Sequence, residues 1–318
     1  MREASLNPAK NHLPSSIDEQ SLIGAVEMSG YPLQGVVAGK LDKIFGVTEE
    51  WGYIDRDTQE HRSLDVFAFK NLSDDRGVKV QPSLALLIEC KRTIHPYVFF
   101  KRVTDRPLRD FPHVAGLPAN RVDLRESSKK RSSYVSPDLI LGLNESSFVR
   151  SDVPKCASFS KAVPSGKRVD LSGEDPFNKI VLPLVKALDH AAHFYSAASM
   201  HPPIVYPTLL LCLCVLDAPM LLIESPDQAK DPILTPWVRV VRQEAASASP
   251  IPLSKPGTRF YTVDVVHIDL LDEVVNGHVL PFAEEFSKRA VQLDTVLIEG
   301  GEVADLDNWT WKEVKPKG

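Results

Sequence analysis

Two short strand-like stretches carry charged residues, among them carboxylates of the type that holds divalent metal ions. Residues 83–91 read Ser-Leu-Ala-Leu-Leu-Ile-Glu-Cys-Lys, an apolar run that becomes charged at Glu89 and Lys91. Side chains alternate between the two faces of a strand, so Glu89 and Lys91 project from the same side, roughly 7 Å apart. Asp65 lies in a second stretch, 62–69, that is rich in β-formers. If the two strands are neighbours, the two carboxylates can hold a hard cation beside an ammonium group, as phosphodiester hydrolysis requires.

The Glu-x-Lys spacing has little specificity by itself, and the chain contains its own comparison. Glu313-Val314-Lys315 has the same spacing, but it lies in a polar, lysine-rich segment with no apolar run before it. Charged residues at the end of a strand also suit a solvated edge or a structural salt bridge, and that alternative stays open. Asp65 and the helical pattern upstream favour a site.

Four runs carry a resemblance to a known family: Ser29-Gly-Tyr-Pro-Leu-Gln34, Gly52-Tyr-Ile-Asp55, Arg62-Ser-Leu-Asp65 and Ile88-Glu-Cys-Lys91. They resemble the PD-(D/E)XK restriction-endonuclease-like superfamily, in particular the branch with Mrr-type and Holliday-junction-resolvase-like nucleases. The resemblance spans about 17–100 and is only topological afterwards. It implies an α/β fold with a restriction-endonuclease-like core. Such a core has a helix, a three-stranded antiparallel start, a crossover helix and further strands in one mixed sheet.

The resemblance also implies roles for individual residues. Asp65 and Glu89 would bind Mg²⁺, or Mn²⁺ as a substitute, with help from the main-chain carbonyl of Cys90. Lys91 would position or deprotonate the attacking water and offset charge on phosphorus. Gln34 would be an auxiliary catalytic residue. The substrate that follows from these roles is DNA.

Three positions depart from the family pattern. Leu64 replaces the proline of the superfamily name, and Ser63 stands where related sequences often carry glutamate. Gln34 occupies a first-helix position that is often glutamate, which weakens any claim of a third acidic metal ligand. Gln34 is therefore either an amide on the flank of a helix or a side chain that orients a metal-bound water.

Composition leaves the choice of partner open. The chain has 318 residues, 43% of them hydrophobic, which suffices for one large α/β domain or two small ones. Its 37 basic and 42 acidic residues give a net charge of −5. The segment 91–131 is locally basic, with eleven Lys or Arg against four acids. That segment could follow a phosphate backbone or form a solvated loop, and both interpretations stay open.

No feature predicts a membrane or a disulfide framework. The four cysteines lack a C-x-x-C spacing and suit buried thiols in a reducing compartment. The N-terminal residues lack the apolar segment of a signal peptide. The longest apolar run, 209–223, is interrupted by Asp217 and Pro219 and is too short to span a bilayer. We therefore expect a cytoplasmic protein without a membrane partner.

Hydrophobic periodicity predicts the order of the elements. A helix begins after Ser16 as N-cap, and a second runs from Leu33 to Phe45. A long helix starts at 174, with a kink at Pro183. The predicted strands cover 51–54, the stretches around Asp65 and Glu89, 207–216, 220–223, 237–242 and 260–268, and a closing helix covers 280–293.

The same reading divides the chain into three parts. Residues 1–15 are expected to be loose, 16–295 to form one nuclease-like domain, and 296–318 to form a C-terminal tail. Within the domain, 104–172 lacks periodicity and is expected to be an irregular insertion that covers the mouth of the site.

The sequence favours a Mg²⁺-dependent deoxyribonuclease of defence, restriction or repair. It could act as a homodimer or within a larger defence or repair assembly. In such an assembly, the chain could be a nuclease subunit that is inactive alone. The alternative is a nuclease-like scaffold that binds nucleic acid or a protein without cutting. Gln34 and Ser63 favour the scaffold because they remove acids that related enzymes often have.

Overall fold

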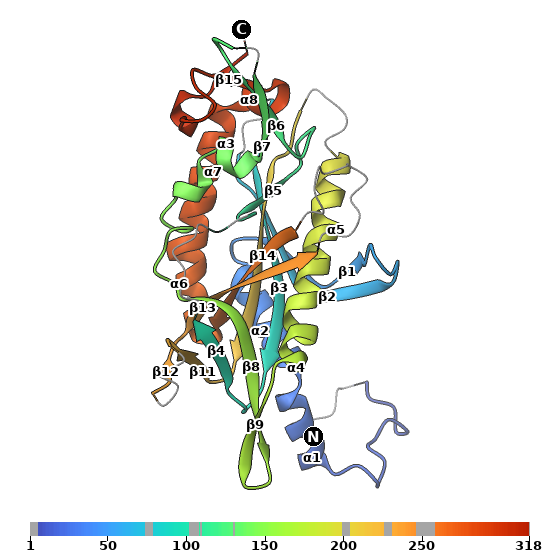
Figure 1. The fold of residues 1–318 in the computed structure, drawn as a ribbon. Coiled ribbons are helices and arrows are strands. Elements are labelled where there is room, and N and C mark those ends of the chain that lie inside the picture. Colours follow the sequence, from blue (N-terminus) through green and yellow to red (C-terminus); the bar gives the residue numbers. More distant parts are fainter. Residues whose placement is uncertain are drawn as a thin grey trace.

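The computed structural model describes residues 6–73, 79–101, 108, 110–129, 131–198, 204–225, 231–245 and 258–317. Within them, twelve strands form one mixed sheet (Figure 1). Ten of these follow the order β1 Gly46–Ile54, β2 His61–Asn71, β3 Ser83–Arg92, β10 Thr208–Asp217, β14 Thr258–His267, β13 Trp237–Ala245, β8 Lys155–Ser165, β4 Tyr97–Lys101, β11 Met220–Ile223 and β12 Ile233–Leu234. Two more strands join at the sides, β5 His113–Ala115 on β10 and β9 Arg168–Ser172 on β8. The expected α/β class with a large mixed sheet is confirmed.

The strands that carry the predicted site lie at one side of this sheet. β1, β2 and β3 pair in antiparallel fashion, whereas β3, β10 and β14 run parallel. Residues 83–90 of β3 are buried, as are 208–216 of β10, because both faces of these strands are covered. The carboxyl ends of β3, β10 and β14 therefore meet at one edge of the sheet, where ligands of α/β proteins commonly bind.

Two helices cover opposite faces of these strands. α2 (Gly30–Leu41) packs against β1, β2 and β3, and its buried stripe includes Leu33, Val37 and Leu41. α5 (Leu182–Ala198) packs against β3 and β10 within a separate apolar cluster. The apolar spacing predicted α2 well, although the helix begins three residues earlier than expected and ends at Leu41.

The first helix, α1 (Glu19–Met28), is capped differently from the prediction. Asp18, rather than Ser16, is the N-cap, and its carboxylate accepts a hydrogen bond from the Ser21 N–H at 2.7 Å. A carboxylate at this position also interacts favourably with the positive end of the helix dipole.

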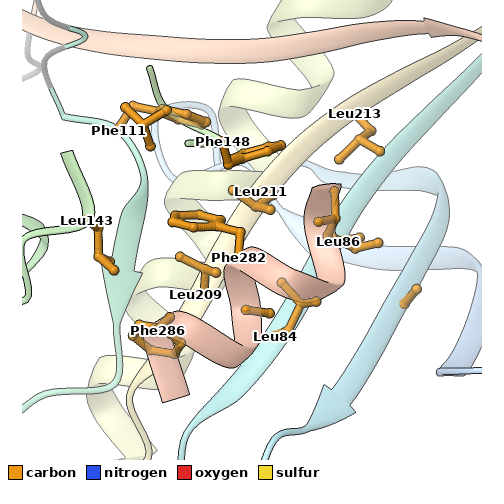
Figure 2. Close-up of a cluster of buried hydrophobic side chains, with 14 of the residues drawn as sticks. Leu84, Leu86, Phe111, Leu143, Phe148, Leu209, Leu211, Leu213, Phe282 and Phe286 are labelled. Atoms are coloured by element: carbon orange, nitrogen blue, oxygen red, sulfur yellow. The ribbon is translucent and has the colours of Figure 1, made fainter. Parts of the chain in front are cut away.

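A third helix, α7 (Leu280–Gln292), belongs to the same apolar cluster as α2 and so covers the same side of the sheet. Figure 2 shows α7 over the strands. Its Phe282 and Phe286 are buried over the apolar side chains of two parallel strands, β3 and β10. Removal of aromatic side chains of this size from water is a dominant favourable term in folding. The residues in this cluster include Leu84, Leu86, Phe111, Leu143, Phe148, Leu209, Leu211 and Leu213.

Both long helical segments contain a π-helical turn just before a proline. The turns cover Phe177–Val181, between α4 (Glu174–Pro176) and α5, and Val275–Val279, between α6 (Leu271–Val274) and α7. Pro183 and Pro281 have no N–H, so an α-helical hydrogen bond is lost one turn earlier. The N–H of the residue before each proline instead bonds five residues back, which is the irregularity expected on sequence at Pro183.

The expectation of an irregular insertion over 104–172 is wrong for the described part of that segment. It contains β5, β8 and β9, and also β6 (Val122–Glu126), β7 (Ser132–Val135), the short helix α3 (Pro137–Ile140) and a 3-10 turn at Leu143–Glu145. Residues 102–107, 109 and 130 lie outside the described residues. The ladders that order this segment are formed with partners far away in sequence, so local periodicity does not reveal them.

The C-terminal segment 296–318, expected to form a tail, contains regular elements. α8 (Asp294–Glu299) leads into β15 (Gly301–Val303), which pairs with β6 in parallel and with β16 (Lys315–Pro316) in antiparallel fashion. A 3-10 turn at Trp311–Glu313 places the Trp311 ring against Gly142 and 4.2 Å from the Arg289 guanidinium. This second, four-stranded sheet lies at the far end of the molecule from α1 (Figure 1).

Residues 6–15, in the segment expected to be loose, are turns and coil, and residues 1–5 lie outside the described part of the chain. One short 3-10 turn, Ile268–Leu270, precedes α6. In the described ranges, no helix has the length and apolar character needed to cross a bilayer.

Candidate functional site

The strand register brings the predicted site residues into one row. β2 and β3 pair with Val66 opposite Ile88, so one step further along Asp65 faces Glu89. Regular pairing between these strands ends at Val66, and the Cys90 N–H instead donates a hydrogen bond to Asp65 Oδ2 at 2.6 Å. Asp65 therefore takes the place of a backbone acceptor at the end of the ladder.

Lys91 joins the two carboxylates. Its Nζ lies 2.5 Å from Glu89 Oε1 and 3.5 Å from Asp65 Oδ2. Glu89 and Lys91 share one face of β3 because they are two residues apart. The structure thus brings together Asp65, Glu89 and Lys91, which lie on two adjacent strands.

Burial controls the electrostatics of this group. Glu89 is only 6% exposed, and its burial raises its pKa to about 7, although the neighbouring Lys91 ammonium partly opposes the shift. Burial alone would lower the pKa of Lys91, but the charges of Glu89 and Asp65 outweigh it and the net shift is upward. Lys91 is therefore a stable ammonium at neutral pH, while Glu89 is poised between its two protonation states.

A cavity of about 480 Å³ opens over these residues. Gln34, which is 5% exposed, lies in its wall on α2, next to Tyr31 and Gly30 at the start of the same helix. Lys179, from the π-helical turn, also reaches this cavity and pairs with Asp175 at 2.5 Å. All five residues predicted for the site line the cavity, since Cys90 does so as well.

The residues present fit a hard divalent cation. Glu89 Oε2 is buried and, within the described residues, has no hydrogen-bond partner, so one carboxylate oxygen is left for a ligand. The Lys91 ammonium pairs with both Asp65 and Glu89, so these carboxylates already stabilise one positive charge. Mg²⁺ needs few protein carboxylates because it keeps several waters.

The possible set of ligands is small. In the described parts of the chain, no group of three or more His, Cys, Asp and Glu side chains is arranged to hold a metal ion. The candidate ligands are therefore the carboxylates of Asp65 and Glu89 and the main-chain carbonyl of Cys90, with solvent for the remaining positions. The Cys90 thiol is buried, and burial raises its pKa, so it stays protonated and is a poor ligand.

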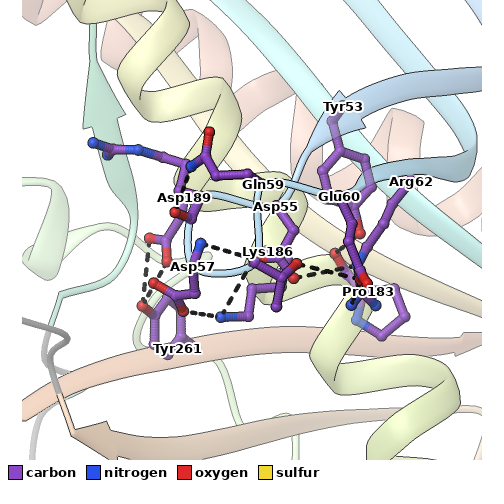
Figure 3. Close-up of polar contacts among 12 residues, drawn as sticks. Tyr53, Asp55, Asp57, Gln59, Glu60, Arg62, Pro183, Lys186, Asp189 and Tyr261 are labelled. Carbon is purple, nitrogen blue, oxygen red and sulfur yellow. Dashed lines mark hydrogen bonds and ion pairs between the residues drawn. The ribbon is translucent and has the colours of Figure 1, made fainter.

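A polar network fixes the turn between β1 and β2 against α5 (Figure 3). Asp55, 1% exposed, pairs with Arg62 at 3.2 Å and with Lys186 at 3.8 Å, and Lys186 also pairs with Asp57. The Tyr53 hydroxyl donates to the Pro183 carbonyl at 3.2 Å. This network holds β1 and β2 against the helix at the turn between them, and it engages Lys186 in two ion pairs.

Several other basic residues do not line the cavity. Arg239 is fully buried and pairs with Asp264 at 2.9 Å, so it is neither a phosphate contact nor part of a solvated edge. Of the basic segment 91–131, Arg125 and Arg131 form ion pairs around the four-stranded sheet, away from the site. Only Lys91 and Arg92 of the described residues in that segment line the cavity.

One acidic residue of the cavity was missed on sequence. Glu50 lines the cavity, and its backbone is left-handed, with φ of 49°. Strict alternation along β1 would place Val47 and Trp51 on one face, yet Val47 packs with the cluster under α2 and Trp51 with the cluster under α5. The strand turns over at Glu50, and the sequence has no signal, such as a glycine, to mark that change.

Comparison with known proteins adds no assignment, because no protein-family model, curated protein or solved structure matches this chain.

Proposed function

We propose that this chain is a divalent-metal-dependent nuclease that hydrolyses phosphodiester bonds of DNA. The observation that carries the proposal is the convergence of Asp65, Glu89 and Lys91 in one cavity, with a buried Glu89 oxygen left unpartnered. The order helix α2, antiparallel strands β1 to β3, helix α5 and parallel strand β10 supports a restriction-endonuclease-like core. The four free, buried cysteines support a cytoplasmic location.

Each residue then has a role that follows from its chemistry. Asp65 and Glu89 would hold the cation with the Cys90 carbonyl, and the cation supplies a Lewis acid that offsets charge on the phosphoryl oxygens. Lys91 is protonated, so it would orient the attacking water and offset charge rather than act as a base. Gln34 would orient solvent from the cavity wall, and Lys179 would contact a backbone phosphate.

Plasmid cleavage with Mg²⁺ tests the proposal. Asp65→Ala and Lys91→Ala should abolish cleavage while the circular dichroism spectrum stays unchanged. Lys315→Ala is the matched control, since Glu313 and Lys315 repeat the Glu-x-Lys spacing in an exposed segment. Cleavage that persists in the Lys91 variant contradicts the role given to Lys91.

The same observation leaves a second candidate, a scaffold that binds nucleic acid or a protein partner without cutting. Lys91 already pairs with both carboxylates, as it would in a purely structural ion pair. Isothermal titration with Mg²⁺ or Mn²⁺ separates the two candidates. Binding that Asp65→Asn removes favours the nuclease, and the absence of any binding favours the scaffold.

A further inference from the structure

Glu50 stands at the end of a row of three carboxylates that crosses three strands. β1 and β2 pair with Glu49 opposite Val66 and Trp51 opposite Leu64, so Glu50 faces Asp65. Asp65 in turn faces Glu89 on β3. Neither pair belongs to the regular ladder, since the β1–β2 pairs skip Glu50 and the β2–β3 pairs end at Val66, so the register gives the order of the three residues across the strands. Glu50, Asp65 and Glu89 are therefore successive neighbours, and all three line the same cavity.

The backbone presents Glu50 to that cavity at a cost. A left-handed φ of 49° is unfavourable for a residue with a Cβ, and it occurs where β1 turns over between Val47 and Trp51. Such local strain persists where the surrounding structure maintains it, frequently at functional sites.

The row carries more negative than positive charge. Carboxylates directly opposite each other on neighbouring strands repel. Lys91 pairs with Asp65 and Glu89, but of the described cationic groups none forms an ion pair with Glu50. Arg92 and Lys179 also line the cavity, yet each has its own partner, Asp217 at 3.0 Å and Asp175 at 2.5 Å. Three carboxylates thus share one ammonium.

A buried oxygen points independently to a ligand at this place. Glu89 Oε2 has no hydrogen-bond partner in the described structure, although Glu89 is more than nine-tenths buried. A buried carboxylate oxygen without a partner is costly, and a bound cation would satisfy it. Gln34, which lines the same cavity, is neutral, so it does not offset the negative charge of the carboxylates.

We propose that Glu50 is the third carboxylate of the cation site, acting together with Asp65 and Glu89. This inference rests on the proposed function, because it assigns a further residue to the same cation. In the described structure the three carboxylates are not yet arranged around one ion. Glu50 is exposed, so its carboxylate reaches the cation by rotation of its own side chain or through a bound water. It supplies the negative charge that Gln34 lacks.

Titration of Mn²⁺ into the full chain, followed by calorimetry, tests this role without reference to cleavage. Glu50→Gln should weaken Mn²⁺ binding about tenfold, the lower end of the effect expected for a residue that supports a metal site. Glu49→Gln is the matched control, because it removes the same charge from the adjacent exposed residue, which does not line the cavity. Glu49→Gln should change the affinity for Mn²⁺ less than about twofold, because salt screens an exposed charge outside the site.

A second variant separates the role of the carboxylate from folding. Asparagine tolerates a left-handed backbone better than glutamate, so Glu50→Asn should unfold at the wild-type temperature or above it and still bind Mn²⁺ about tenfold more weakly. Equal affinities for Glu50→Gln and Glu49→Gln, with wild-type binding intact and abolished by Asp65→Asn, overturn the role of Glu50 alone. No Mn²⁺ binding by the wild type overturns the cation site as a whole.

Discussion

The raised pKa of Glu89 makes cation binding depend on pH. With a pKa of about 7, Glu89 is ionised in about one tenth of molecules at pH 6 and in about nine tenths at pH 8. Only the ionised carboxylate binds a cation, so the apparent affinity for Mn²⁺ should rise about tenfold between these pH values, or about 1.4 kcal/mol. Lys91 stays protonated over this range because its pKa is raised, so Glu89 dominates the change.

Calorimetry can count the proton directly. At pH 7 each bound Mn²⁺ should release about half a proton from Glu89, measured as the difference in binding heat between two buffers of unlike ionisation enthalpy. Without metal, the stability of the fold depends on pH in the opposite direction, falling as the pH rises. A carboxyl whose folded pKa lies above its ordinary 4.5 stabilises the fold at low pH, and that contribution, about 3 kcal/mol, is lost as the pH rises to about 7.

Glu89→Gln provides the control for the stability measurement, because the amide does not titrate. The difference in the free energy of unfolding between wild type and Glu89→Gln should therefore change with pH between about 4.5 and 7. A carboxyl resonance of Glu89 that titrates near its ordinary value, or a Mn²⁺ affinity that is equal at pH 6 and 8, would refute the reasoning.

Three further predictions concern the framework. Asp264→Ala leaves the Arg239 guanidinium buried without its carboxylate and should cost about 3–5 kcal/mol of unfolding free energy in urea denaturation; a cost below 1 kcal/mol contradicts it. Phe286→Ala removes a fully buried ring and should also lower the free energy of unfolding by about 3–5 kcal/mol. Phe194→Ala is the control, because its ring is 58% exposed, and it should lower the free energy of unfolding by less than about 1 kcal/mol. Equal losses for the two variants would refute the burial argument. Burial lowers the pKa of His113 to about 4, so its ring should stay neutral at pH 5.5 in NMR titration, and protonation near pH 6.5 would be the contrary result.

Local pattern was sufficient to predict the elements that carry the site. The apolar run before Glu89 and the β-formers around Asp65 are both strands, and their pairing as neighbours follows from the short connection between them. Alternation then places Glu89 and Lys91 on one face. The contacts of both carboxylates with Lys91 agree with that expectation, while catalysis itself stays a prediction.

Partners that are distant in sequence explain most of what was missed. β6 pairs with β15, and β8 pairs with β13 and β4, so neither the segment 104–172 nor the C-terminal segment shows its order locally. Arg239 has the period-two pattern expected of a strand, but its partner Asp264 lies on the next strand of the sheet, so the pattern alone did not reveal that the side chain is buried.

Glu50 illustrates a different limit. A left-handed residue inside a strand is detectable on sequence when it is a glycine or an asparagine, but not when it is a glutamate. The change of face between Val47 and Trp51 depends on two clusters packed on opposite sides of the sheet. Only the assembled fold, therefore, shows which way this carboxylate points.

The parallel pairing of β6 with β15 has a consequence for biosynthesis. During synthesis on a ribosome, the hairpin of β6 and β7 emerges long before Gly301–Val303. Until β15 is made, one edge of β6 has no strand partner for its peptide groups. Contacts between such remote segments close late and slow the overall reaction. We expect nascent chains arrested before β15 to be the species most prone to aggregate or to recruit chaperones.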